Sequence, residues 1–254
     1  MNAYEVLAQE PDPVVVTDAS AREKIAATGK PWKIRHVASG IVMLLCPPGE
    51  FVMGEGRGAH RRTIGAAFYL SQNEVSKAEW RAIAGDAPGY FKVDELPVET
   101  VSWNDIHEDF LGPARGFFRL PSKAEWEFAC RAGTTTRYSF GETITNEQAC
   151  YDSQAPVACG SLPANPWGFH EMHGNVWEWV ADAHAGRSSE AGGQEAVEGD
   201  ASSDRVWRGG SWSGDSYSVR SSTRDYGTPR DAISSLGFRV AANCEHIQPR
   251  TRVE

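Results

Sequence analysis

The stretch from Trp167 to Ala181, WGFHEMHGNVWEWVA, constrains the fold of this 254-residue chain more than any other segment. Three tryptophans and a phenylalanine alternate there with two glycines and an asparagine, so large rings stand beside residues that accept tight backbone bends. This pattern predicts a turn buried in the core. A second segment, Arg208 to Trp212 (RGGSW), has the same character and is predicted to pack against the first.

Within this stretch, Asn175 and Glu178 each supply an oxygen atom. A carboxylate between two tryptophans is costly unless something satisfies its charge, and a bound cation would do so. Calcium prefers hard oxygen ligands of this type. We therefore expect a structural calcium ion at Asn175 and Glu178. His170 and His173 are weaker candidates for a metal, because the sequence around them does not predict a helix.

Composition narrows the class of protein. A chain of this length that is 41% hydrophobic can bury one full core, and 25 glycines with nine tryptophans predict a loop-rich fold held by aromatic clusters. We expect a domain over residues 38–254, with residues 1–37 as an N-terminal extension packed on it. The net charge of −9 argues against a nucleic-acid partner.

The N-terminus has neither a basic start nor a continuous apolar segment, so we expect no secretory signal, no membrane span and a cytoplasmic protein. Five cysteines without close spacing favour free thiols over a disulfide framework. Cys150 and Cys159 are close enough in sequence to leave a bond between them open.

Local signals predict several elements. A short helix is expected over residues 18–27, and apolar runs at 41–46 and 51–53 predict two strands around a turn, forming a hairpin. Residues 68–70 predict a further strand. Capping boxes at Ser76 and Ser122 predict helices that end near Gly85 and Gly133. The small, polar and acidic residues 185–204 are typical of a mobile loop, either an insertion or a lid.

Several motifs in fixed order resemble one known family. GNVWEW (174–179), RGGSW (208–212) and LGFRV (236–240) follow PGEFVMG (48–54) and RLPSKAEWEFAC (119–130). From about residue 38 to 242 the chain resembles the formylglycine-generating enzyme, or sulfatase-modifying factor, family. The resemblance implies an α+β fold related to C-type lectins, with much irregular structure.

The same resemblance raises the question of catalysis. Catalytic members carry two copper-binding cysteines in the region matching Gly209 to Arg239, but no cysteine occurs there, and Ser211 is the only active-site residue of the family that can be placed. Hydroxyl groups do not replace thiolates toward copper(I), so we expect no copper and no oxidase activity. The family's iron-dependent sulfoxide synthases take their iron ligands from an extra N-terminal helical domain with a His-rich helix. Residues 1–37 are too short for such a domain, and His36 is their one histidine. A metal-dependent oxidoreductase therefore remains an alternative only with an unrecognised or partner-supplied metal site.

Residues 213–235 offer a positive argument for binding. These 23 residues include no Lys, Glu, Gln, Met or Trp, types that fill roughly one position in five of an average protein, so missing all of them has a chance on the order of 1%. The residues that do occur are those reachable when the adenines of an AAC codon are replaced.

That composition resembles the variable proteins of diversity-generating retroelements, many of which use this lectin-like fold as a scaffold. On this interpretation Val219, Arg220, Arg224, Pro229, Arg230 and residues 236–239 form a frame. The exposed contacts are then Ser213, Gly214, Asp215, Ser216, Tyr217, Ser218, Asp225, Tyr226, Asp231, Ser234 and Ser235, and Ser211 and Trp212 complete the residues expected to bind a protein or small-molecule ligand. A Ser-rich surface loop without diversification is the open alternative.

Overall fold

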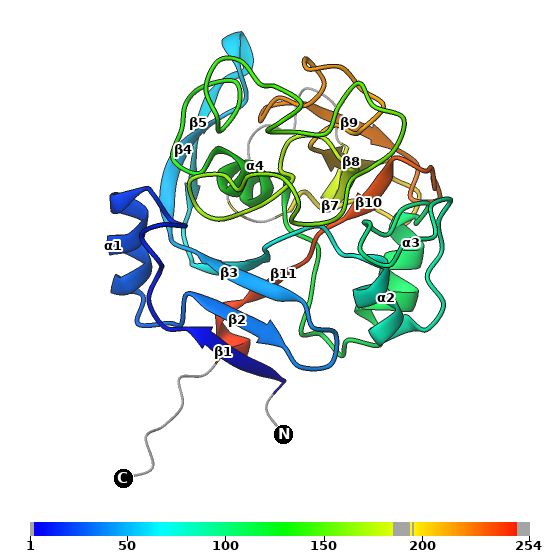
Figure 1. Ribbon diagram of the computed structural model, residues 1–254, viewed down its shortest axis with the longest axis horizontal. Coiled ribbons are helices and arrows are strands. Elements are labelled where there is room, and N and C mark those ends of the chain that lie inside the picture. Colours follow the sequence, from blue (N-terminus) through cyan, green and yellow to red (C-terminus); the bar gives the residue numbers. More distant parts are fainter. Residues whose placement is uncertain (1–2, 185–193, 195, 248–254) are drawn as a thin grey trace.

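The computed structural model describes residues 3–184, 194 and 196–247 (Figure 1). The residues 185–193 and 195 of the predicted mobile loop lie outside this description. An antiparallel five-stranded sheet has the order β1-β2-β3-β6-β11. Its strands are β1 (Tyr4–Ala8), β2 (Lys33–His36), β3 (Val42–Cys46), β6 (Phe68–Ser71) and β11 (Ala241–Asn243). The N-terminal extension thus contributes two strands to this sheet.

A second sheet carries the central stretch and has the order β10-β7-β8-β9. It consists of β7 (Trp177–Ala183), β8 (Arg205–Arg208), β9 (Arg224–Gly227) and β10 (Leu236–Phe238). The two segments predicted to pack together do so directly, because Glu178 on β7 pairs with Arg208 on β8. β10 runs parallel to β7, which places Gly237 opposite Glu178.

The expected strands at 41–46 and 51–53 exist, but the hairpin between them is wrong. β3 pairs with β2 and β6, whereas β4 (Gly49–Met53) pairs with β5 (His60–Ile64). Only Pro47 and Pro48 separate β3 from β4. Because proline fixes φ at about −65°, this pair cannot adopt the positive φ that a two-residue hairpin turn needs, and the chain passes from one sheet to the next.

The helices begin where the caps predicted. Asp18 caps α1 (Ala19–Ala27), and complete capping boxes start α2 (Lys77–Ala84) at Ser76 and α4 (Lys123–Arg131) at Ser122. All nine residues of α4 are buried, and the helix packs against β4, β5, β7 and β8. The remaining helical segments are α3 (Trp103–Asp105), η1 (Gly56–Gly58), the π-helix η2 (Ile106–Leu111) and η4 (Cys244–His246).

The result is a mixed α+β fold with long irregular connections, the class expected from the motifs. Most buried apolar side chains form one cluster that joins both sheets and α4, with a small second cluster around Tyr138 and Val219. Within the described residues, no helix has the length and apolar character needed to cross a lipid bilayer. All five cysteines are free thiols.

Candidate functional site

The segment after the double glycine is fixed through its backbone. The amide of Trp212 donates to the carbonyl of Asn175 at 2.7 Å, and the carbonyls of Trp212 and Gly214 accept from the amides of Ser153 and Asp152, also at 2.7 Å. None of these bonds uses a side chain of the segment. Its path is therefore set independently of which side chains it carries.

Arg208 fixes the turn that follows. Its guanidinium is fully buried and donates to the carbonyls of Ser221, Ser222 and Thr223, three consecutive residues, while Nη2 also pairs with Glu127 at 2.5 Å. An arginine presents several donors in a rigid fork, so it can hold a turn of main chain in one conformation. The backbone between Tyr217 and β9 is consequently held from inside the protein.

Side chains on this frame point outward. Six of the predicted contact residues are exposed, and we call them the binding face: Ser213, Asp215, Ser216, Tyr217, Asp225 and Tyr226. Trp212, Ser218 and Asp231 are half-buried at its margin. Ser211 is buried, and its hydroxyl lies 3.2 Å from that of Ser213, so it belongs to the support and not to the exposed surface. Ligand contact by these residues stays a prediction.

The predicted frame is buried at most of its positions. Val219, Pro229 and residues 236–239 are buried, as expected, and Arg220 is half-buried. The expectation is wrong for Arg224 and Arg230, which are exposed. Arg224 begins β9, which lies at the edge of its sheet beside β8 in the part of the chain that the structure describes, and Arg230 follows buried Pro229 on the outside of a turn. An exposed edge leaves room for long charged side chains.

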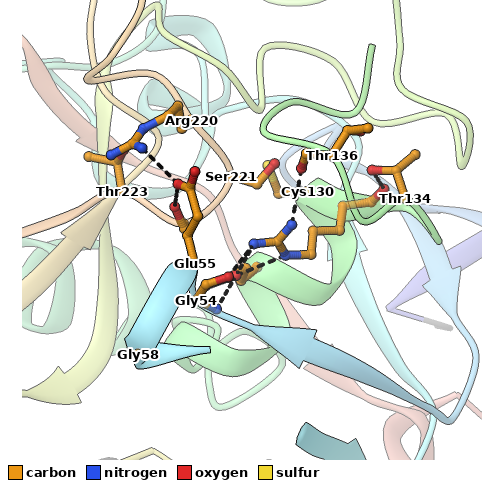
Figure 2. A network of polar contacts seen from close by, with 12 residues as sticks. Gly54, Glu55, Gly58, Cys130, Thr134, Thr136, Arg220, Ser221 and Thr223 are labelled. Atoms are coloured by element: carbon orange, nitrogen blue, oxygen red, sulfur yellow. Dashed lines mark hydrogen bonds and ion pairs between the residues drawn. The ribbon is translucent and has the colours of Figure 1, made fainter. Parts of the chain in front are cut away.

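Both tyrosines of the binding face pack against neighbouring side chains. The Arg220 guanidinium lies 3.5 Å from the centre of the Tyr217 ring and donates to Glu55 at 2.7 Å. Figure 2 shows Glu55, at the tip of the β4–β5 hairpin, reaching across to Arg220. Tyr226 stacks on His184 with ring centroids 3.6 Å apart and planes 6° from parallel. Because few rotamers remain to be lost, either ring can bind a ligand at little entropic cost.

The expected calcium ligands have protein partners. Arg239 donates to both oxygens of Glu178 at 2.7 and 2.9 Å, and Trp126 Nε1 donates to Oε2 at 2.6 Å. The Asn175 amide accepts from the Val157 N–H and donates to Glu74. The premise that the charge of Glu178 lacks a protein partner is therefore wrong, because Arg239, 61 residues away in sequence, supplies a positive charge. A calcium ion at Asn175 and Glu178 stays a prediction.

Among the described residues, no group of three or more His, Cys, Asp and Glu side chains is arranged to hold a metal ion. Sequence analysis missed Arg239 because its motif was assigned to the frame without a partner. The one available signal was the pairing rule itself: a buried carboxylate requires a buried cation, and the chain offers arginines in RGGSW and LGFRV.

The buried nucleophiles near the face are inert. Cys130 is fully buried, and burial raises its pKa to about 12, while burial raises the pKa of Cys150 to about 11. His173 Nδ1 donates to the Val219 carbonyl, and Nε2 accepts from Ser139. Burial lowers the pKa of His173 to about 4, against a smaller opposing effect of the Val219 bond. His173 is thus a neutral support for Val219, and Cys130, although 3.9 Å away, lies in a closed core.

Comparisons with known proteins agree with this fold. Residues 33–244 match the family described as the sulfatase-modifying factor enzyme 1-like domain. Over 189 residues the chain is 33% identical to the inactive C-alpha-formylglycine-generating enzyme 2 of Mus musculus, covering 66% of this chain and 56% of that protein. The chain spans 25% to 56% of the length of the first curated relatives, which include a formylglycine-generating enzyme of Mus musculus.

Two solved structures are similar throughout most of the chain. PvdO from Pseudomonas aeruginosa has a TM-score of 0.72 and 25% identity, covering 81% of this chain and 95% of that one. Treponema denticola variable protein 1 has a TM-score of 0.69 and 23% identity, covering 80% and 95%, a likeness that concerns the fold alone. The expected α+β fold of formylglycine-generating enzymes, which is C-type-lectin-like, is confirmed.

Proposed function

This chain belongs to the family of sulfatase-modifying factor enzyme 1-like domains, and we propose that it is a non-catalytic member that binds a ligand through the binding face. The observation that carries the proposal is the combination of a backbone fixed from inside and side chains that point outward. Tyr217 is 66% exposed and Tyr226 48% exposed, yet both rings are held in place by neighbours. Tyrosine, serine and aspartate on a rigid support are typical of recognition surfaces.

The chemistry of the region supports the same proposal. Copper(I) catalysis needs accessible thiolates, and residues 209–239 contain none, while nearby Cys130 and Cys150 have raised pKa values. An inactive relative with 33% identity shows that the fold occurs without the formylglycine-generating activity. We therefore favour binding over the alternative of a metal-dependent oxidoreductase with a partner-supplied site.

We further propose that the face is diversified, in the manner of variable proteins encoded with retroelements. The residue set of 213–235 supports this, since it omits the five types that adenine replacement in AAC codons cannot produce. The fold similarity to a variable protein of Treponema denticola is consistent with it. Sequencing the gene across closely related strains tests the idea: substitutions should concentrate at adenines of the codons for the binding face. An even spread of substitutions along the gene would refute it.

Binding itself is tested with a phage-displayed library of random linear peptides selected on the intact protein. Peptides enriched on the wild type should lose binding to Tyr217→Ser and to Tyr226→Asn, and these variants should melt within about 2 °C of the wild type because surface changes cost about 0.5 kcal/mol or less. Phe238→Ala should instead be destabilised by several kcal/mol because its ring is fully buried, and Trp212→Ala by less because its ring is half-buried. Peptides that bind all surface variants equally, or a library that enriches nothing, would refute the binding face.

A further inference from the structure

A loop outside the variable stretch reaches the binding face. The Phe91 ring meets the Trp212 ring edge-on, with centroids 5.9 Å apart and planes at 88°, and the Tyr90 ring packs edge-on against Phe91 at 5.1 Å. Trp212 Nε1 donates to the Ser234 carbonyl at 3.3 Å. A row of three rings therefore runs from this loop to the Trp212 end of the binding face.

Resting on the proposed function, we infer that Tyr90 and Trp212 form a constant anchor of the binding face that receives an apolar or aromatic side chain of a protein partner. Tyr90 is 75% exposed, the largest exposure of any aromatic side chain among the described residues. It lies outside residues 213–235, so it is the same whatever the face carries. Large aromatic residues of this kind supply most of the energy in many protein interfaces.

Tyr90 is held out by a buried ion pair. Lys77 Nζ lies 3.0 Å from Glu99 Oε1 and donates to the Pro88 carbonyl at 2.9 Å, and the same oxygen of Glu99 accepts from the Phe91 amide at 3.0 Å. Lys77 and Glu99 are 1% and 0% exposed. The two buried charges bind the main chain of the loop before and after Tyr90, at Pro88 and Phe91, so the tyrosine ring stands on a fixed backbone.

Gly89 explains how the loop comes so close to this pair. Its φ is +121°, and a Cβ at this position would lie 2.0 Å from Lys77 Nζ and 2.3 Å from Glu99 Oε1. Any other residue would push the loop away from the pair or break it. The sequence Gly-Tyr-Phe is therefore built so that backbone packs on the ion pair while the tyrosine ring projects outward.

Shape and charge indicate a protein as the occupant. Tyr90 and Tyr217 are 75% and 66% exposed, so their rings project from the surface. Projecting rings fit into depressions of a partner protein and do not enclose a small molecule. Residues 213–235 contain three aspartates and three arginines, a balanced set that selects no strongly charged ligand. Apolar contact is left as the main attraction, as at the centre of protein interfaces.

The distribution of exposed hydrophobic side chains supports a protein partner at this site. Five of the ten exposed large hydrophobic side chains of the described residues gather in two segments. They lie in this loop and in the 213–235 stretch: Tyr90, Val93, Tyr217, Tyr226 and Ile233. Most of the others belong to the N-terminal part of the chain, among them Val6 on β1, which Figure 1 places at the opposite end of the molecule from β8 and β9. Val6→Ser is thus a matched control, a lost exposed hydrophobic group away from the face.

The experiment uses peptides selected on the wild type from the random library and measures their dissociation constants on single variants of the full chain. Tyr90→Ala should weaken binding by at least about thirtyfold, as expected for an interface hot spot, with unchanged melting. Tyr90→Phe should retain most of the affinity, because the ring and not the hydroxyl fills the partner. Val6→Ser should bind like the wild type.

The outcomes separate the two proposals. Peptides weakened by Tyr217→Ser but unaffected by Tyr90→Ala would overturn the anchor and leave the binding face standing. Peptides indifferent to both substitutions would overturn both. Gly89→Ala gives an independent check, since it leaves Tyr90 in the sequence but displaces its support: peptide affinity should fall with the ring still present, and unchanged affinity would show that the Lys77 and Glu99 pair does not position Tyr90.

Discussion

Replacing Arg239 by methionine should destabilise the protein more than the loss of a surface charge can. Both Arg239 and Glu178 are 0% exposed, and the guanidinium donates to both carboxylate oxygens. The substitution leaves a buried carboxylate whose remaining donor is Trp126. Arg239 also donates to the carbonyls of Ser71 and His170, so three separate segments lose a partner at once.

Removing one member of a buried ion pair costs about 3–5 kcal/mol. For a chain of this size each kcal/mol lowers the melting temperature by roughly 2–4 °C, so Arg239→Met should melt about 6–20 °C below the wild type. Urea unfolding followed by tryptophan fluorescence measures the free-energy loss directly. Arg35→Met is the control, because Arg35 and Glu5 form an exposed pair that is worth about 1 kcal/mol or less.

The double variant Arg239→Met with Glu178→Gln should recover part of the loss, since no charge is then left buried without a partner. A cost of Arg239→Met no larger than that of Arg35→Met would refute the reasoning. So would a wild-type protein that loses stability in chelator and regains it in calcium while Glu178→Gln responds to neither. That result would return a calcium ion to Asn175 and Glu178.

Three further predictions follow from the site. Burial holds the pKa of His173 at about 4, below its unfolded value of about 6.5, so the unfolded chain takes up the proton first as pH falls. The free energy of unfolding should therefore fall by about 3 kcal/mol between pH 6.5 and pH 4. Urea titrations at acid pH should show this loss in the wild type and not in His173→Gln. A sulfatase-type peptide incubated with the protein, copper and oxygen should keep its cysteine by mass spectrometry, because residues 209–239 offer no thiolate. Ellman titration of the unreduced, denatured protein should count five thiols, and a count of three would indicate a bond between Cys150 and Cys159.

The sequence predicted what depends on neighbouring residues. The capping boxes at Ser76 and Ser122 place the starts of α2 and α4 because each involves bonds across three residues. The exposure of the six residues of the binding face followed from the residue set of 213–235. The pairing of strands that are distant in the sequence could not be predicted from such local signals. The strands predicted at 41–46 and 51–53 were expected to pair, but each pairs with a strand farther along the chain.

The same limit applies to the site. Glu178 and Arg239 are 61 residues apart in sequence, and Phe91 and Trp212 come from loops even farther apart. Neither contact therefore leaves a local pattern in the sequence. Exposure was predicted from the residue set of one continuous segment, whereas the partner of a buried charge depends on the whole fold. Arg224 and Arg230 show the reverse error: a position beside buried residues was assumed to be buried itself.

The arrangement of buried charges gives the strongest reason why this fold suits a variable surface. Three buried ion pairs join segments distant in sequence: Arg208 with Glu127, Arg239 with Glu178, and Lys77 with Glu99. The first holds the turn at residues 221–223, and the third holds the loop that carries Tyr90. Such pairs contribute little net stability but penalise any other backbone arrangement, because a displaced segment leaves a charge buried alone. They act through main-chain carbonyls and amides of the loops they hold, as Arg208 does at residues 221–223. The backbone conformation of the binding face is thus fixed by residues that do not belong to the face. The exposed side chains can therefore vary without changing that backbone.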